Sequence, residues 1–192
     1  TAIIGLLPIE KARELARRIL ALAAPTTLLS ALQVVALLIE TWLAARQGRY
    51  ALAGWAVVLP FALLLGQMSA GAMGGGVVSA IARALGAGKP EEAARLALHA
   101  LLIALGFATG FVLLLAVWGR PVLTAIGGAE AAAAGVPYAA WLFGAGALPA
   151  WLANTLASIL RGAGRHALAA RVLNGCWIAY PPLAWLLAEP LG

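Results

Sequence analysis

Charged residues are scarce in this sequence, and their scarcity argues against a soluble protein. Only 10% of the 192 residues are charged, 64% are apolar, and aspartate is absent. Soluble domains average about 25% charged and about 45–50% apolar residues. Because a membrane-spanning helix needs roughly 20 apolar residues, the chain has room for about five spans and for no additional soluble domain.

Residues that commonly bind metals or carry catalysis are also few. Cys176 is the single cysteine, which excludes a disulfide scaffold, and it has no clustered metal-ligand partners, since His99 and His166 lie at expected helix ends. The glycines at 74–76 lie in an apolar stretch and lack the lysine of a phosphate-binding loop. We therefore expect neither an enzyme nor a bound cofactor.

The apolar residues form five long stretches. The two-residue alternation of a membrane barrel is absent, and helices are then the remaining structure that satisfies the backbone within lipid. We predict an all-α, multi-pass membrane protein with an amphipathic interfacial segment at 1–18 and a transmembrane region at 19–192. Its spans are expected near residues 19–45, 51–84, 93–118, 136–160 and 167–188.

The basic residues are distributed unevenly between the two ends of these stretches. Ten lie in the N-terminal segment and in the second and fourth connections, and three lie in the first and third connections. Since cytoplasmic loops carry the excess of Lys and Arg, we expect a cytoplasmic N-terminus in a plasma or inner membrane. The basic residues that produce the net charge of +6 are thus distributed as in a membrane protein, and the charge does not indicate nucleic-acid binding.

Tryptophans mark the opposite ends of the stretches. Trp42, Trp55, Trp118 and Trp185 fall near the ends that this orientation places outside. Aromatic side chains of this kind form belts at the membrane interface, so we interpret these four as an outer belt.

The first stretch has one polar side. Thr26, Ser30, Gln33 and Glu40 fall within an arc of about 80° at 3.6 residues per turn. Glu40 lies inside the span, where an ionised acid normally faces a partner or a watery cavity. One interpretation is a cation or proton site, which the aligned Gln33 and Ser30 favour; the other is a carboxylate solvated at the outer interface.

Further polar residues are candidates for the lining of the same cavity. They are Gln67 on the second stretch and Asn174 and Tyr180 on the fifth. Polar side chains in spans also join helices by hydrogen bonds, and the spacing alone does not separate the two roles.

Glycines and prolines are expected to shape the helices. The second stretch is about 51 Å long as a helix, which exceeds the hydrocarbon thickness, so its inner end must project into the cytoplasm, tilt strongly or unwind. The glycines of residues 71–76 would make such an adjustment easiest, but helix packing is the role we favour for them. Gly71 and Gly75 also have the spacing of closely packed helices. Pro25 lacks an amide hydrogen and is predicted to kink the first helix. The pair at 181–182 interrupts the fifth stretch, and we favour a plain kink near the membrane edge over a broken helix that lines a binding site.

Three sequence motifs resemble the multidrug and toxic compound extrusion (MATE) transporters. Gln33 precedes Glu40-Thr41 as a glutamine precedes an Asp-Thr pair by seven residues in the family's first helix. The run at 73–89, MGGGVVSAIARALGAGK, resembles the second helix and the following cytoplasmic loop, and LRGAG at 160–164 is similar to the loop after helix four. The motifs occur in family order, and the resemblance covers nearly the whole chain.

The resemblance implies a particular architecture and activity. MATE transporters have twelve helices in two six-helix lobes, so this chain would be a fragment, the N-terminal lobe without its sixth helix. The implied activity is antiport, in which organic and often cationic compounds or drugs leave in exchange for protons or sodium ions. The implied partners are membrane lipid, these small organic molecules and the missing C-terminal lobe.

The resemblance also implies which residues couple ion flow to export. The coupling site falls on Glu40 and Gln33 and, on the fifth helix, on Asn174, and a sodium ion would bind near Glu40 and Asn174. Glutamate replaces the family's aspartate at Glu40, and Ile178 stands where some members carry a second acid. The choice between H⁺ and Na⁺ therefore stays open.

Two other functions also stay open. A flippase or exporter of lipid-linked saccharides with a related fold would be favoured by several arginines in the cavity, and within the spans only Arg171 is present, near one end. A membrane scaffold subunit that does not transport would use the polar side of the first helix for packing. Labelling of Glu40 by a water-soluble carboxyl reagent would favour a cavity over packing.

Overall fold

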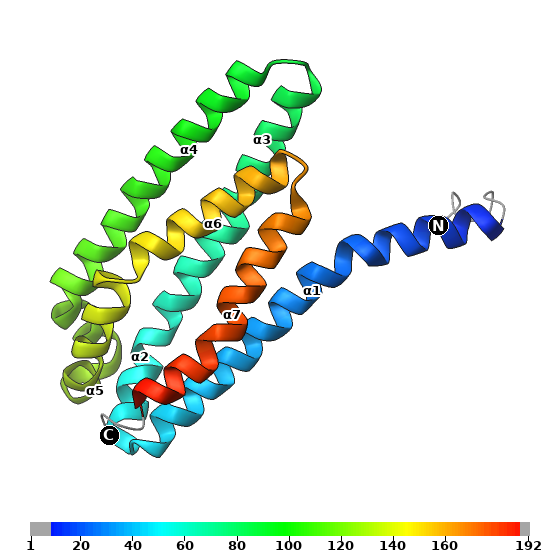
Figure 1. Cartoon of the computed structure of the whole chain (residues 1–192). Helices are drawn as coiled ribbons and strands as arrows, with labels where there is room; N and C mark the ends of the chain where they lie inside the picture. The colour runs from blue at the N-terminus through cyan, green and yellow to red at the C-terminus, as the bar shows by residue number, and fades with distance from the viewer. Residues whose placement is uncertain (1–8, 189–192) are drawn as a thin grey trace.

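Helices make up nearly all of the structure (Figure 1). The computed structural model describes residues 9–188, apart from the side chains of a few residues near either end, which include Pro25 and Thr26. The elements are α1 (Ile9–Arg46), α2 (Arg49–Gly66), η2 (Gln67–Met73), α3 (Gly74–Gly86), α4 (Pro90–Phe111), η3 (Val112–Val117), α5 (Gly119–Gly144), α6 (Ala147–Gly162) and α7 (His166–Ala188). Residues 9–188 contain no strand, and the predicted all-α class is confirmed.

Two of the long helices contain a π-helical segment. The helices α2, η2 and α3 continue into one another over the 38 residues Arg49–Gly86, which corresponds to about 57 Å. The π-helical part, η2, ends directly before Gly74, within the region where the glycines predicted an adjustment. The second π-helical segment, η3, ends α4. Such segments are rare and often occur near functional sites.

The connections alternate between the two ends of the bundle (Figure 1). The turns α3–α4 and α6–α7 lie at one end, and the α1–α2 connection lies at the other with the end of α7. Gly88 ends the first of these turns with a φ of +72°, a backbone conformation that side chains with a Cβ rarely adopt. The amide of Lys89 then donates to the carbonyl of Ala84 at 2.9 Å, which closes the turn.

The region of the fourth expected span, 136–160, contains a break. α5 begins at Gly119 and kinks at Gly128, where φ is +80°. It ends at Gly144, and α6 follows from Ala147 at an angle of 44°. Gly128 adopts a conformation that favours glycine, and a Cβ at Gly146 would clash with the carbonyl oxygen of Leu142, so glycine fits both bends.

The two prolines of the fifth stretch do not break the helix, so a broken helix there is wrong, while a kink stays a prediction. α7 continues across Pro181 and Pro182 to Ala188, and the backbone of α1 likewise continues past Pro25. Each proline removes one backbone hydrogen bond, but its φ near −65° suits a helix. The intact bonds on either side hold the helix together, because lipid offers the backbone no other partner.

By length and composition, three helical segments can cross a membrane: Thr27–Arg46, Arg49–Gly86 and Pro90–Val117. The bent pair α5–α6 is a fourth if it counts as one span. α7 has 23 residues and lies beside α1, and it contains Arg171, Asn174 and two prolines. The expectation of about five spans thus corresponds to three or four apolar spans and α7.

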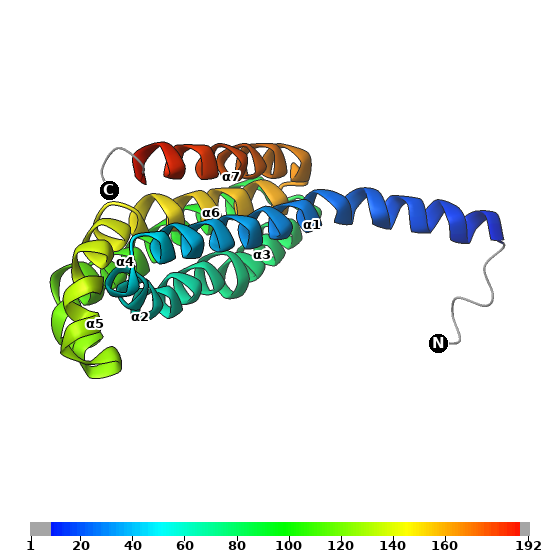
Figure 2. The same cartoon turned by 90° about the horizontal axis from the view of Figure 1, so that it is seen from below.

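The core lies between α2, α4, α5 and α6, and α7 covers one side of the bundle (Figure 2). Trp151 is fully buried, and its ring packs on Phe107 and Phe111 with centroid distances of 5.4 and 5.5 Å. Small residues bring the helices close together. A Cβ added to Gly54 of α2 would lie 2.7 Å from the carbonyl carbon of Ala134 on α5.

A buried polar network joins η2 to α6. The amide nitrogen of Asn154 donates to the hydroxyl of Ser69 at 2.8 Å, and Ser69 is completely buried. Ser158 donates to the backbone carbonyl of Asn154 at 2.8 Å and accepts a hydrogen bond from Arg161 at 3.0 Å. These polar residues of α6 therefore connect helices and lie apart from the first helix.

Candidate functional site

Glu40 and Tyr180 form the polar contact between α1 and α7. The hydroxyl of Tyr180 donates a hydrogen bond to Oε1 of Glu40. Glu40 is half-buried, and Tyr180 retains 36% of its exposure. The contact forms because α1 and α7 lie side by side and run in the same direction (Figure 1). A carboxylate that lies 140 positions from its partner in the sequence thus becomes part of a shared site.

This pair opens into a cavity of about 690 Å³. Four helices supply its walls, so residues from distant parts of the sequence meet around a single carboxylate. The lining residues are Glu40, Leu43 and Ala44 of α1, Gln47 of the turn that follows, Ala51 and Trp55 of α2, Ala134, Pro137, Tyr138 and Trp141 of α5, and Tyr180 and Ala184 of α7.

The aromatic wall of the cavity is fixed by specific contacts. The indole nitrogen of Trp55 donates to the hydroxyl of Thr41 at 3.0 Å, and that hydroxyl donates to the carbonyl of Leu37 at 2.8 Å. Trp55 and Tyr138 meet edge to face with 5.3 Å between ring centroids. A carboxylate beside the faces of aromatic rings attracts cations by charge and by cation–π interaction.

Trp55 therefore does not belong to an outer membrane belt, as its position in the sequence suggested. It is only 5% exposed, whereas Trp42, Trp118 and Trp185 are at least half exposed. Trp42 also lies under the guanidinium of Arg46, 4.9 Å from its ring centroid, as expected for a residue at a membrane interface.

Asn174 lies deeper along α7 and has an unused acceptor. Its Oδ1 is buried, and it accepts no hydrogen bond from any described residue. Asn174 precedes Tyr180 by six residues, about 9 Å along the helix, and Gln33 precedes Glu40 by seven, about 10.5 Å. Because α1 and α7 run in the same direction, Gln33 and Asn174 lie at similar depth.

The other predicted site residues do not line the cavity. Ser30, Gln33 and Gln67 are exposed on the surface of the lobe, and the side chains of Thr26 and Pro25 lie outside the described part of the structure. The structure thus joins Glu40 and Tyr180 in one cavity, while Asn174 and Gln33 are related to it by depth alone.

Of the two glycines predicted to allow close packing, neither packs tightly within the lobe. A Cβ added to Gly75 would meet nothing within 4 Å, and one added to Gly71 would meet only the side-chain oxygen of Gln67, at 3.5 Å. The adjacent Gly74 packs tightly instead, since its added Cβ would lie 2.8 Å from the hydroxyl of Ser158.

Sequence reasoning missed the aromatic residues of the cavity. Trp55 resembled an interfacial tryptophan, and Tyr138 and Trp141 stood near an expected helix end. The spacing Pro137, Tyr138 and Trp141 puts two aromatic side chains three residues apart on one helical face, which was the available signal. Only the packing of α2 against α5 shows that Tyr138 and Trp141 line the same cavity as Glu40.

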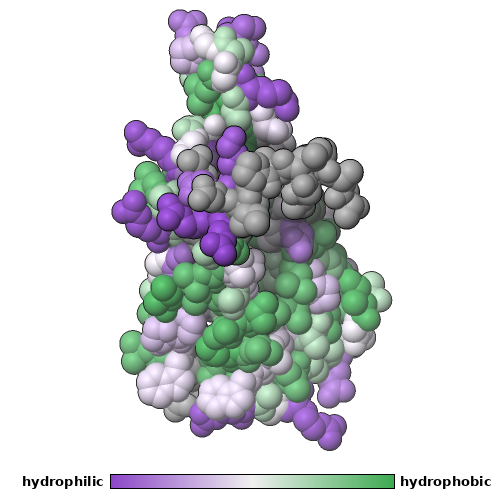
Figure 3. Space-filling view, turned by 90° about the vertical axis from the view of Figure 1, so that its right-hand side faces the viewer, coloured by the Kyte–Doolittle hydropathy of each residue, from purple (hydrophilic) through white to green (hydrophobic). Residues whose placement is uncertain are grey.

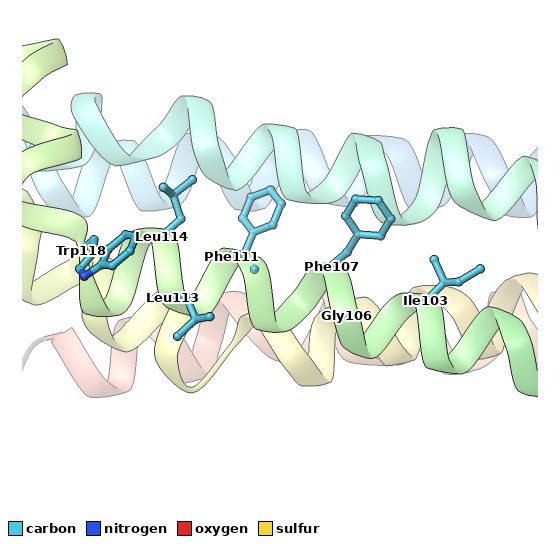
Figure 4. Close-up of a pocket in the computed structure, with 8 residues that line it drawn as sticks. Ile103, Gly106, Phe107, Phe111, Leu113, Leu114 and Trp118 are labelled. Atoms are coloured by element: carbon cyan, nitrogen blue, oxygen red, sulfur yellow. The ribbon is translucent and has the colours of Figure 1, made fainter.

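A second cavity, of about 730 Å³, runs along α4 and η3 (Figure 4). It is lined by Ile103, Gly106, Phe107, Gly110, Phe111, Leu113, Leu114 and Trp118. None of these side chains is ionisable, so this groove has no group that could bind an ion or exchange a proton.

Within residues 9–188, no three His, Cys, Asp or Glu side chains gather in a way that could hold a metal ion. Ile178, at the position of the second acid of some MATE transporters, is 58% exposed. A sodium ion at Glu40 would be bound by the carboxylate and by neutral oxygens, and Asn174 does not line this cavity. Those ligands fit a weakly held, exchangeable hard cation.

A bundle of membrane-crossing helices that encloses an acidic, aromatic cavity has the architecture of a membrane transporter. The model of the MatE family matches residues 25–186, and the chain belongs to this family. The resemblance seen in the motifs is thereby confirmed.

Two solved structures have the same fold. One is a MOP superfamily transporter from Pyrococcus furiosus that is described as having a binding pocket of reverse polarity. The other is a multidrug resistance MATE family transporter of the MOP superfamily in an outward-facing conformation. Each is 26% identical to this chain, with a TM-score of 0.71 over 84% of it. The matched part is 36% of each solved chain, so this chain spans about a third of their length. No curated protein sequence matches it significantly.

Proposed function

We propose that the chain forms most of the N-terminal lobe of an antiporter that exports organic, often cationic, compounds in exchange for protons or sodium ions. The observation that carries the proposal is the half-buried Glu40 carboxylate at the wall of an aromatic cavity. An acid in a membrane span is costly to keep, by about 2.5–3.5 kcal/mol on insertion scales, and normally marks an ion or substrate path.

The proposed coupling depends on one charge. When Glu40 is ionised, the cavity attracts a cation, and the aromatic rings of Trp55 and Tyr138 favour an organic one. When Glu40 holds a proton or a sodium ion, the cavity has lost that charge and its affinity for the organic cation falls. This difference in affinity biases the packing of the lobe between its inward-open and outward-open forms.

Asn174 supports a coupling path along α7. A buried acceptor without a donor costs about 1–3 kcal/mol, and a cation or a water molecule would remove this cost. Gln33 lies at similar depth on α1, so both amides are available to an ion that passes between the membrane centre and Glu40.

The chemistry of the lining favours this proposal over a lipid-linked saccharide flippase. Such a substrate carries phosphates, which need basic partners. The cavity is lined by one acid and no basic side chain among the described residues. A scaffold role would require Glu40 only for packing, whereas the cavity leaves it accessible to solutes.

Transport measurements on the full-length protein in proteoliposomes test the proposal. We expect Glu40→Ala and Glu40→Gln to abolish efflux of a fluorescent organic cation, and Glu40→Asp to keep most of it. Imposing a proton gradient or a sodium gradient separately identifies the coupling ion. Glu130→Gln is the matched control, because Glu130 is an exposed acid outside the cavity. Unchanged efflux by Glu40→Ala would refute the proposal.

The same proposal includes a location and an orientation. We infer a plasma or inner membrane protein with its N-terminus in the cytoplasm, because ten basic residues lie in the segments of one side. Labelling of single cysteines from the outside should then reach a residue of the α1–α2 connection, and it should not reach one in the α3–α4 turn.

A further inference from the structure

The first part of α1 extends away from the rest of the protein. Both views show it projecting beyond the end of the bundle that contains the α3–α4 and α6–α7 turns (Figures 1 and 2). The family match begins only at residue 25, and the apolar span of α1 begins at Thr27. Residues 9–24 therefore form a helical segment that precedes both the family match and the span and lines no part of the Glu40 cavity. This segment is called the N-terminal arm here.

The arm is amphipathic around its circumference. At 100° per residue, the apolar residues Ala12, Leu15, Ala16, Ile19 and Ala23 fall on one side, and every charged residue of the arm falls on the other. The charged residues are Glu10, Lys11, Arg13, Glu14, Arg17 and Arg18. The basic residues outnumber the acidic ones by two to one, so the polar side carries a net positive charge.

Neither side of the arm is covered by the bundle. Leu15 is 49% exposed, Ile19 56% and Leu20 68%. Arg17 pairs with Glu14 at 3.6 Å, yet its side chain stays 82% exposed and accessible. Figure 3, which looks toward this end of α1, shows hydrophilic side chains gathered in the upper part of the molecule above a mainly apolar band.

We propose that the N-terminal arm binds the anionic phospholipid surface of the leaflet next to the α3–α4 turn. Its apolar side inserts among the acyl chains, and Lys11, Arg13 and Arg17 contact the headgroup phosphates. Charge complementarity selects this occupant, because basic residues in a segment adjoining a span bind anionic lipid, while the exposed leucine and isoleucine side chains leave water.

The connection to the span allows this orientation. An arm lying in the plane of the membrane must bend where it meets the span. Pro25 stands at that junction and lacks an amide hydrogen, so a bend there breaks no additional hydrogen bond at this position. The proposal concerns a segment outside the cavity and does not depend on the transported substrate.

The test measures the depth of the arm in lipid nanodiscs that contain the full-length protein. Spin labels are placed singly at Leu15→Cys and Ile19→Cys on the apolar side and at Ala24→Cys on the basic side, with Cys176 and any further cysteine replaced. Accessibility to oxygen reports the lipid interior, and accessibility to a water-soluble nickel complex reports the aqueous phase. The nanodiscs contain either phosphatidylcholine alone or phosphatidylcholine with about 30% of the anionic lipid phosphatidylglycerol.

In anionic nanodiscs, labels at 15 and 19 should be accessible to oxygen, and the label at 24 should be accessible to nickel. In neutral nanodiscs, all three should be accessible to nickel. The proposal is overturned if positions 15 and 19 stay accessible to nickel in anionic lipid. It is also overturned if the oxygen pattern is the same in both lipids, which would indicate that protein contacts hold the arm.

Charge variants separate lipid binding from folding. Arg13→Gln with Arg17→Gln should lower the ratio of lipid-inserted to water-exposed arm, measured from the labels at 15 and 19, roughly fivefold for each charge removed. Arg13→Lys with Arg17→Lys should leave it unchanged. Arg83→Gln with Arg95→Gln removes the same charge at the same end of the bundle, from exposed positions outside the arm, and should have no effect. An equal loss in this control pair would contradict the proposal.

Discussion

Tyr180 of α7 donates a hydrogen bond to the Glu40 carboxylate of α1, and this contact joins the first and last helices of the lobe. Any movement of α7 relative to α1 must therefore change the surroundings of the acid. The pair links the occupancy of the cavity to the packing of the helices.

Tyr180→Phe should weaken transport without removing the acid. The substitution keeps the ring and deletes the donor, and a hydrogen bond to a charged group contributes about 1.5–3 kcal/mol. We expect about a tenfold lower efflux rate in proteoliposomes. Tyr50→Phe, on an exposed tyrosine outside the cavity, is the control and should transport normally. A normal rate for Tyr180→Phe would show that the hydroxyl is dispensable.

Gly54→Ala should destabilise the contact between α2 and α5. Its Cβ would lie 2.7 Å from the carbonyl carbon of Ala134, so one helix must shift, which costs about 1–3 kcal/mol. Thermal unfolding in detergent, followed by tryptophan fluorescence, should show a lower midpoint. In Gly66→Ala, on the same helix, the new Cβ meets nothing within 4 Å, so the midpoint should hold or rise slightly.

The hydrogen bond between Asn154 and Ser69 should contribute measurably to stability. Asn154→Leu leaves the buried Ser69 hydroxyl without its donor, and Ser69→Ala removes the acceptor. A double-mutant cycle isolates their interaction, for which we expect about 0.6–1.7 kcal/mol, as in other membrane proteins. Additive effects of the two substitutions on unfolding would mean that the contact contributes nothing.

Gly88→Ala should destabilise the α3–α4 turn, because its φ of +72° is unfavourable for a residue with a Cβ by about 1–2 kcal/mol. Gly86→Ala, two residues earlier, falls within α3 and has open space around its Cβ. It should therefore be neutral or slightly stabilising. If both variants unfold at the same temperature, the conformation of Gly88 does not limit stability.

The hydrophobic pattern sufficed to predict the class of fold and the order of the helices. Long apolar stretches without alternation can satisfy their backbone in lipid only as helices. Proline was misread at 181–182, because the local rule that proline breaks a helix ignores the bonds that continue on both sides. The break after Gly144 was missed, since no single residue there forbids a helix.

The sequence by itself determined that Glu40 is unusual, because an acid within an apolar stretch stands out without any knowledge of its neighbours. Only the tertiary structure decided what surrounds it. Trp55, Tyr138 and Tyr180 come from three other helices, and their approach to Glu40 depends on how α2, α5 and α7 pack against α1. Packing arises from contacts between distant segments, and periodicity along one helix carries no information about them.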